Sequence, residues 1–352
     1  MIKGDTILGQ SIKSDTIKRY VSAAAELFTD RWGNMADPYE CKTLRRNYPK
    51  ILISALARYE KVPNRREIIT HDMFEHIAKQ ADRAGPDSLV ASFKDWLSWS
   101  RYGGPRQGEW CQEKSKTKYK EVEGIAGEAQ AFRLDDLAFY DHNSRGIDPR
   151  DTLICNVAYA TVRWRYQKNK DNGEIIKYYA DSRGNRWCPV YALLSIAQRA
   201  IRMNIPSNEP IAKYNQGTKQ YFITAKNVAT ILQEAAYETM GITDPKVLQK
   251  WTSHSLRVTA ANELHRMGFS DAYIKHRLRW RSDAFMKYLR HTIHVARKHT
   301  EALSLTNKNL QLEKSNLDRV NDRIDGIQLH RCRDENDILW RQYFYAKDST
   351  VV

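Results

Sequence analysis

Residues 160–179, ATVRWRYQKNKDNGEIIKYY, decide the fold of this 352-residue chain. The first half alternates apolar and polar side chains: Val162, Trp164 and Tyr166 against Arg163, Arg165 and Gln167. Alternation of this kind predicts a half-buried β-strand. Asn172-Gly173 favours a tight turn, and EIIKYY follows as a second β-rich run. The stretch therefore predicts an antiparallel hairpin with one face in a core.

Helical patterns lie on both sides of this hairpin. Before it, apolar side chains recur at helical spacing in four segments, residues 14–28, 44–59, 70–81 and 87–100. Gly103-Gly104 ends the last of them, and helical patterns resume at Pro189 and continue to the C-terminus. Because helices and strands do not alternate, we expect an α+β fold that is mostly helical, with a small antiparallel sheet.

A basic connector, KVPNRRE at 61–67, separates an N-terminal helical part from the rest, because Pro63 and Asn64 break regular structure. We therefore expect three parts: an N-terminal helical domain at 1–62, a larger domain at 63–300 and a C-terminal tail at 301–352.

The composition favours a polyanionic partner. The chain carries 57 Lys and Arg against 42 Asp and Glu, which gives a formal net charge of +15 and a pI of about 9.5. Residues 241–300 alone hold 12 Lys and Arg against 4 Asp and Glu, with six of the ten histidines. Such an excess suits nucleic acid, although a basic stretch is also what an ordinary solvated face contains.

The cysteines and the N-terminus indicate a cellular setting. The five cysteines are scattered with no paired spacing, which argues against a zinc ribbon or a disulfide framework and fits a reducing compartment. The opening MIKGDTILGQ lacks the apolar core of a signal peptide, and no run approaches membrane-spanning length. We expect a soluble, intracellular protein with no membrane partner.

Four separate stretches carry groups that phosphate chemistry requires. They are PRQGEW with Arg106 and Glu109, the hairpin tip with Lys168, HSLR with His254 and Arg257, and RWRSDAFMKYLRHT (279–292) with Trp280 and Tyr288. Taken singly, each has a plainer interpretation: a surface arginine, a solvated lysine, a helix cap or a core aromatic. Glu109 lies one helical turn after Arg106, which predicts that it positions local structure by pairing with an arginine.

Taken together and in this order, these residues resemble the active-site set of the tyrosine recombinase (phage integrase) family. The resemblance covers most of the chain and implies an N-terminal core-binding domain that clamps DNA, followed by a catalytic domain to about residue 300. The motif RWRSDAF…Y is similar to the corresponding motif in recombinases of eukaryotic mobile elements of the crypton or DIRS type. In such a protein the nucleus is the expected location in a eukaryotic host, and the cytoplasm or nucleoid otherwise.

The resemblance implies cleavage and rejoining of double-stranded DNA through a 3′-phosphotyrosyl bond on Tyr288, with no metal, ATP or other cofactor. It also implies a tetramer on DNA, in which a C-terminal segment docks onto the neighbouring subunit. In the tail, Leu310, Leu317 and Ile324 recur every seven residues. That spacing fits either an intermolecular helix seam or packing against the tail's own domain.

The residue types suit the chemistry that the resemblance implies. Arg106 and Arg257 carry planar guanidinium groups that bind two phosphate oxygens at once. His254 and the indole of Trp280 add hydrogen-bond donors or assist proton transfer. Lys168 is the expected general acid for the leaving 5′-oxygen, and Tyr288 the expected nucleophile.

The sequence departs from the family pattern in three places. Trp280 and Tyr288 are eight positions apart, one fewer than is usual in bacterial members, and Pro105 stands where the family has another apolar residue before its first arginine. Lys170 lies two residues from Lys168, so either lysine fits the general-acid role.

Other basic residues are expected to contact the DNA backbone. They are Arg45, Arg46, Lys50, Arg65, Arg66, Arg163, Arg165, Arg279 and Arg281. For Arg163 and Arg165 a solvated sheet edge is an equally good interpretation. His291, His294 and His299 follow a run rich in Arg and Lys, where phosphate contact or solvation is preferred to metal binding.

Two other functions fit part of the pattern. A type IB topoisomerase uses a similar arginine, lysine, histidine and tyrosine set to relax DNA, but the HxxR box, Trp280 and the tail favour a recombinase. A domesticated DNA-binding protein that has lost catalysis is the second alternative, and the complete residue set argues against it.

Overall fold

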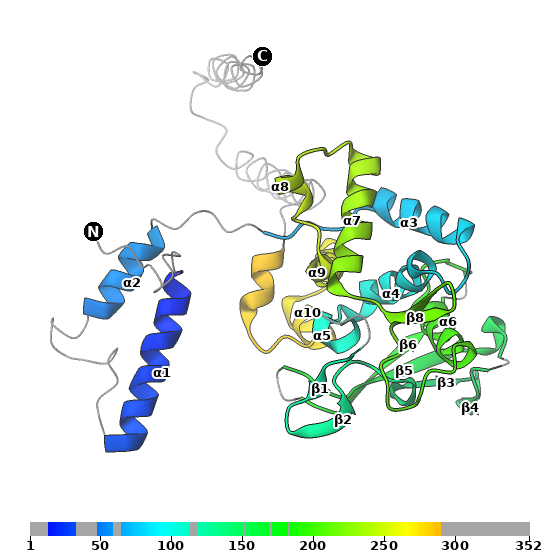
Figure 1. Cartoon of the computed structure of the whole chain (residues 1–352), viewed down its shortest axis with the longest axis horizontal. Coiled ribbons are helices and arrows are strands. Elements are labelled where there is room, and N and C mark those ends of the chain that lie inside the picture. The colour runs from blue at the N-terminus through cyan, green and yellow to red at the C-terminus, as the bar shows by residue number, and fades with distance from the viewer. Residues whose placement is uncertain are drawn as a thin grey trace, which may run out of the picture. The chain divides into compact units, whose positions relative to one another are not determined.

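The computed structural model describes residues 13–32, 48–58, 65–112, 118–150, 152–168, 171–181 and 183–289 (Figure 1). Several predicted features lie outside these residues: the boundary near residue 62, Arg45, Arg46, Lys170, the histidines of 291–299 and the tail at 301–352. By its contacts the chain divides into two compact units, residues 1–259 and 260–352, with the division inside helix α9 (Ser253–Arg266).

Two helices stand at the N-terminal end, α1 (Ser14–Trp32) and α2 (Tyr48–Arg58), and they contact each other. Both coincide with helices predicted from the apolar spacing. Lys50, a predicted DNA contact, lies in the first turn of α2.

Four further helices of the first unit are α3 (His71–Arg83), α4 (Leu89–Gly103), α6 (Pro189–Arg202) and α7 (Ala225–Met240). Helix α4 packs between α3 and α6, and α3 also contacts α7. Thr70 and Ser88 cap α3 and α4 by accepting hydrogen bonds from backbone N–H groups, which fixes the residue at which each helix begins. Gly104 ends α4 in the left-handed conformation that glycine tolerates best.

A four-stranded antiparallel sheet in the order β4-β3-β5-β6 covers this helical layer. Its strands are β3 (Leu137–Tyr140), β4 (Gly146–Ile147), β5 (Tyr159–Trp164) and β6 (Glu174–Tyr179). The predicted hairpin is confirmed as β5 and β6, with Val162 opposite Ile176 and Trp164 opposite Glu174.

The predicted alternation was wrong beyond Trp164. Strand β5 ends there, and Gln167, which was expected on the polar face, is buried. The cause is local hydrogen bonding: the Gln167 backbone N–H donates to the Asn172 side chain at 2.8 Å, and its amide donates to the Glu174 carboxylate at 3.1 Å. These bonds tie residue 167 to residues 172 and 174, so strand pairing does not continue to Asn172-Gly173 as a two-residue turn requires.

Two hairpins were not predicted: β1 (Glu121–Val122) with β2 (Ile125–Ala129), and β7 (Lys213–Gln216) with β8 (Lys219–Phe222). Short helices complete the described chain: α5 (Gln107–Trp110), α8 (Pro245–Leu248), α10 (Asp271–Arg277), and the 3₁₀ turns Leu134–Asp136, Ile154–Asn156 and Asp283–Tyr288. The fold is therefore α+β and mostly helical with small antiparallel sheets, as expected. None of the described helices has both the length and the apolar character needed to cross a membrane.

An aromatic cluster fills the space between α4 and the sheet. The Trp96 and Trp110 ring centroids are 5.1 Å apart, and those of Trp99 and Trp164 are 5.5 Å apart. Each of these four indole side chains is at most 2% exposed. The cluster joins α4, α5 and β5, and so fixes the elements that carry Arg106 and the Lys168 loop.

Gly103 is where this cluster leaves least room. A Cβ at Gly103 would lie 2.8 Å from an atom of the Trp99 ring and 3.2 Å from the Tyr178 hydroxyl. We expect Gly103→Ala to lower the free energy of unfolding in urea by about 1–3 kcal/mol, because overpacking forces the indole to shift. Gly85→Ala is the matched control, since a Cβ there meets nothing within 4 Å. Equal stability of the two variants would contradict the packing described here.

Candidate functional site

Arg106 is held by Glu109. It immediately precedes α5, and the Glu109 carboxylate accepts hydrogen bonds from its backbone N–H at 2.6 Å and from its guanidinium at 2.9 Å. Glu109 is buried, whereas the Arg106 side chain is 23% exposed. Glu109 therefore fixes the orientation of an arginine whose charge still reaches solvent. This confirms the predicted pairing of Glu109 with an arginine.

Arg257 is anchored beside the same turn. It lies on α9, is 2% exposed, and donates through Nη1 to the Gly104 carbonyl oxygen at 2.5 Å. Gly104 is the residue that ends α4, two positions before Arg106. A buried guanidinium bonded to a helix-terminal carbonyl is electrostatically favourable, because the C-terminal end of a helix carries partial negative charge.

A second bond ties α9 to the other side of Arg106. The Ser253 hydroxyl donates to the Gln107 side-chain oxygen at 2.6 Å. The N-terminal end of α9 is thus bonded to the residue after Arg106 and, through Arg257, to a residue two positions before it. This arrangement brings the HxxR box and Arg106 together, although they are about 150 positions apart in the sequence.

His254 lies in the first turn of α9 and is half-buried. Burial, together with the nearby positive charges of Arg257 and Arg66, lowers the pKa of His254 from 6.5 to about 4. The imidazole is therefore neutral at neutral pH, with one donor and one acceptor nitrogen. Arg66, a predicted DNA contact, donates to the Gln249 carbonyl oxygen at 2.8 Å, whereas Arg65 is exposed.

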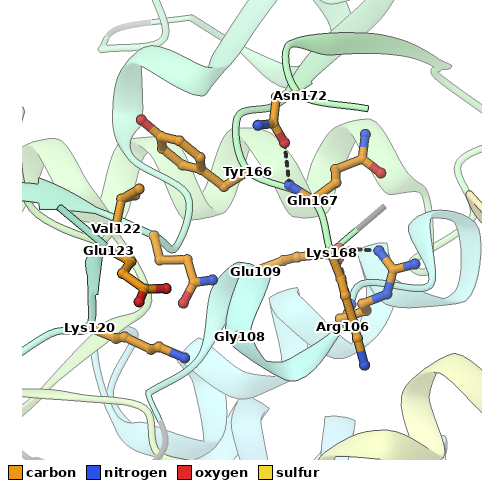
Figure 2. Close-up of a pocket in the computed structure, with 11 residues that line it drawn as sticks. Arg106, Gly108, Glu109, Lys120, Val122, Glu123, Tyr166, Gln167, Lys168 and Asn172 are labelled. Carbon is orange, nitrogen blue, oxygen red and sulfur yellow. Dashed lines mark hydrogen bonds and ion pairs between the residues drawn. The ribbon is translucent and has the colours of Figure 1, made fainter. Parts of the chain in front are cut away.

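Lys168 is exposed in the loop between β5 and β6. It lines one pocket, of about 440 Å³, together with Arg106 (Figure 2). The structure therefore brings Lys168, Arg106, His254 and Arg257 to one region of the first unit. The alternative general acid, Lys170, lies outside the described residues.

Arg163 and Arg165 surround a buried carboxylate. Asp136, 2% exposed, accepts from Arg163 Nε at 3.0 Å and from Arg165 Nη2 at 2.8 Å. Arg165 also donates to Glu128 at 2.7 Å. Burial raises the pKa of Asp136, while its bonds to Arg133 and Arg163 act in the opposite direction. These contacts give both arginines a structural role at the base of the Lys168 loop, and their contact with DNA stays a prediction.

Trp280 and Tyr288 belong to the second unit. Their ring centroids are 5.1 Å apart, both side chains are half-buried, and both pack on a small core of Ala260, Ala261, Ile274, Leu278 and Phe285. The 3₁₀ turn at Asp283–Tyr288 accommodates the short spacing between the two aromatic residues. The Tyr288 carbonyl oxygen accepts a hydrogen bond from the Asn262 side chain at 2.8 Å, which fixes the backbone of Tyr288.

The two arginines that flank Trp280 differ in exposure. Arg279 is 4% exposed and has a φ of 57°, in the left-handed region that side chains rarely adopt, whereas Arg281 is exposed. Arg281 is therefore the better placed of the two for a DNA phosphate. Trp280 and Tyr288 are assigned to the same site as Arg106, Lys168, His254 and Arg257 only because of the order of these residues in the sequence.

Metal binding has no candidate cluster in the part of the chain that the structure describes. Within those residues, no three or more His, Cys, Asp or Glu side chains gather in a way that would hold an ion.

Comparisons with known proteins give a limited likeness. No protein-family model matches the chain, and no curated protein is similar to it in sequence. The chain is similar to the Tn1549 transposon integrase solved with a circular intermediate DNA, at 14% identity over 84% of this chain and 80% of that one, with a TM-score of 0.39. It is also similar to XerA recombinase, at 16% identity over 83% and 84% of the two chains, with a TM-score of 0.38.

The depressed pKa of His254 makes folding stability depend on pH. Between the ordinary value of 6.5 and about 4, the unfolded chain binds a proton that the folded chain does not. The free energy of unfolding therefore decreases as the pH falls through this window. Above pH 6.5 His254 does not lower it, because the imidazole is neutral in both the folded and the unfolded chain. We expect wild-type protein to lose about 2 kcal/mol more than His254→Gln between pH 7 and pH 4.5.

Urea unfolding at several pH values measures this difference, and an NMR titration of the imidazole checks the pKa directly. His142→Gln, which removes an exposed histidine, is the matched control. A His254 titration midpoint near 6.5 would show that the imidazole is not desolvated beside the arginines.

Proposed function

We propose that this protein is a site-specific DNA recombinase or integrase, which cleaves and rejoins double-stranded DNA through a 3′-phosphotyrosyl bond on Tyr288. The observation that carries the proposal is the pair of bonds from α9 to the chain on both sides of Arg106. They gather two arginines and a histidine at one point, in the order of residues that resembles the tyrosine recombinases.

The two arginines supply the charge that phosphodiester cleavage needs. A guanidinium has five N–H donors, so anchoring one of them fixes the plane of the group and orients the rest. Arg106 is oriented by Glu109 and Arg257 by the Gly104 carbonyl. In the proposed reaction both bind the non-bridging oxygens of the scissile phosphate, and because they are positioned beforehand, little reorganisation accompanies the transition state.

His254 and Lys168 serve proton transfer. The phenol of Tyr288 loses its proton to the neutral His254 or to solvent, and the phenolate oxygen forms a bond to phosphorus. The bond from phosphorus to the 5′-oxygen breaks, and Lys168 supplies the proton that this oxygen takes up. A free 5′-hydroxyl from another strand reverses the same steps, so no external energy source is consumed.

The finer parts of the proposal rest on the sequence. RWRSDAF…Y suggests a mobile-element recombinase, active in the nucleus if the host is eukaryotic, and the tail suggests a tetramer on DNA. Among the predicted backbone contacts, the exposed Arg65 and Arg281 have the accessibility that phosphate binding requires.

Trapping on a suicide substrate tests the nucleophile. Duplexes from the DNA that flanks the gene, nicked at successive positions, release the leaving strand and prevent religation. We expect wild-type protein to form a covalent adduct and Tyr288→Phe to bind the same DNA normally with no adduct, because the phenolic oxygen is absent.

Tyr273→Phe is the matched control: this tyrosine is 42% exposed, lies in the same unit, and its ring contact with Phe269 survives the substitution. An adduct that persists in Tyr288→Phe would place the nucleophile elsewhere. Relaxation of supercoiled plasmid without strand exchange would favour a type IB topoisomerase. If the wild-type protein binds the DNA but forms no adduct, the result would favour a catalytically silent DNA-binding protein.

A further inference from the structure

The pocket that contains Arg106 and Lys168 is larger than a phosphate requires. Its volume of about 440 Å³ lies in the range of pockets that hold a whole small molecule. Its walls come from α5, from β1 and the turn after it, and from the loop between β5 and β6 (Figure 2). Gln130 also lines it. The proposed cleavage uses Arg106, Lys168 and the Glu109 carboxylate that orients Arg106, so most of the pocket is left for another part of the substrate.

The remaining lining residues have the chemistry of a nucleotide site. Tyr166 contributes an aromatic ring and Val122 an apolar side chain, both half-buried. Lys120 adds a cation to those of Arg106 and Lys168 on the pocket wall, which also carries the carboxylates of Glu109 and Glu123. A flat aromatic surface for stacking beside several cations suits a base attached to a phosphate.

Gln130 is the polar group that distinguishes the pocket. Its side-chain oxygen is shielded from solvent and accepts no hydrogen bond from any residue that the structure describes. A buried carbonyl oxygen in this state calls for a partner. The amide carries an acceptor oxygen beside an NH₂ donor, so it can pair with the donor–acceptor Watson–Crick edge of a base.

We propose that this pocket binds one nucleotide, which lies next to the scissile phosphate and is unstacked from the duplex. This proposal rests on the proposed function. The base of that nucleotide lies against Tyr166, and its donor–acceptor edge meets the Gln130 amide. A paired base presents that edge to its partner strand, and in a duplex both of its faces are covered by the bases stacked on it. Only a nucleotide turned out of the helix satisfies both conditions.

Gly108 offers a way to close the pocket without breaking its walls. It lies on α5 at the pocket surface, and a Cβ there would come no closer than 3.9 Å to any other side chain, the contact being with the Gln130 side-chain oxygen. A leucine at this position would therefore extend into the pocket with no backbone clash. Gly146→Leu is the matched control, since a Cβ at Gly146 meets nothing within 4 Å and Gly146 does not line the pocket.

The test measures DNA binding by the Tyr288→Phe protein, which separates it from cleavage. A single mismatch is placed in turn at each position around the cleavage site, and affinity is compared with that for the fully paired duplex. We expect one flanking position at which the mismatch raises affinity about tenfold, because the cost of unpairing is removed. Removing the base of that nucleotide should abolish the gain.

In the Gly108→Leu protein, also carrying Tyr288→Phe, the gain should vanish while affinity for paired DNA stays within about twofold, and Gly146→Leu should keep the gain. Gln130→Leu provides a second variant if Gly108→Leu does not fold. It should reduce the gain without lowering the melting temperature, because the oxygen it removes has no partner to lose.

A mismatch gain at no position, or a gain that persists in the foldable pocket variants, would overturn the nucleotide site. These outcomes are distinct from failure of the proposed function. Adduct formation by wild type without any mismatch gain would remove the pocket proposal alone. A pocket-dependent gain without any adduct would remove the proposed cleavage and leave the nucleotide site in place.

Discussion

The bond from the Arg257 guanidinium to the Gly104 carbonyl is the interaction on which the site depends. It joins the helix that carries the HxxR box to the end of α4, where the chain turns towards Arg106. Without it, the buried guanidinium would lose a hydrogen-bond acceptor that it reaches at 2.5 Å, and the N-terminal half of α9 would lose one of its ties to the chain around Arg106. The aromatic cluster around Trp99 then holds α4, α5 and β5 in register with this anchor.

The first unit holds several cations close together, and it does so in three ways. Glu109 balances Arg106, and Asp136 with Glu128 balances the arginines at the base of the Lys168 loop. His254 stays neutral because it is desolvated beside Arg257 and Arg66. A phosphate entering this region would meet oriented donors whose mutual repulsion is already offset, which is the condition for electrostatic preorganisation.

Features set by neighbouring residues could be predicted from the sequence, and features set by distant ones could not. The β5–β6 hairpin, the cap at Thr70 and the pairing of Glu109 with Arg106 all follow from spacings of a few residues. The Ser253–Gln107 bond spans 146 positions and Asp136 lies 27 from Arg163, so no periodicity reveals either contact. Gln167 was misplaced because its side chain bonds to its own loop, which competes with strand pairing.

The central claim is that Arg106 and Arg257 act by neutralising one phosphate. Suicide duplexes with a methylphosphonate at the cleavage position test it most directly, because a methyl group replaces one charged oxygen. On the ordinary phosphate, Arg106→Ala should slow adduct formation at least about a hundredfold, as loss of a preorganised donor does. On the methylphosphonate the same variant, and Arg257→Ala where it folds, should come within about tenfold of wild type. An equal loss on both substrates would contradict the account, because the arginines would then be acting on something other than the charge of the phosphate.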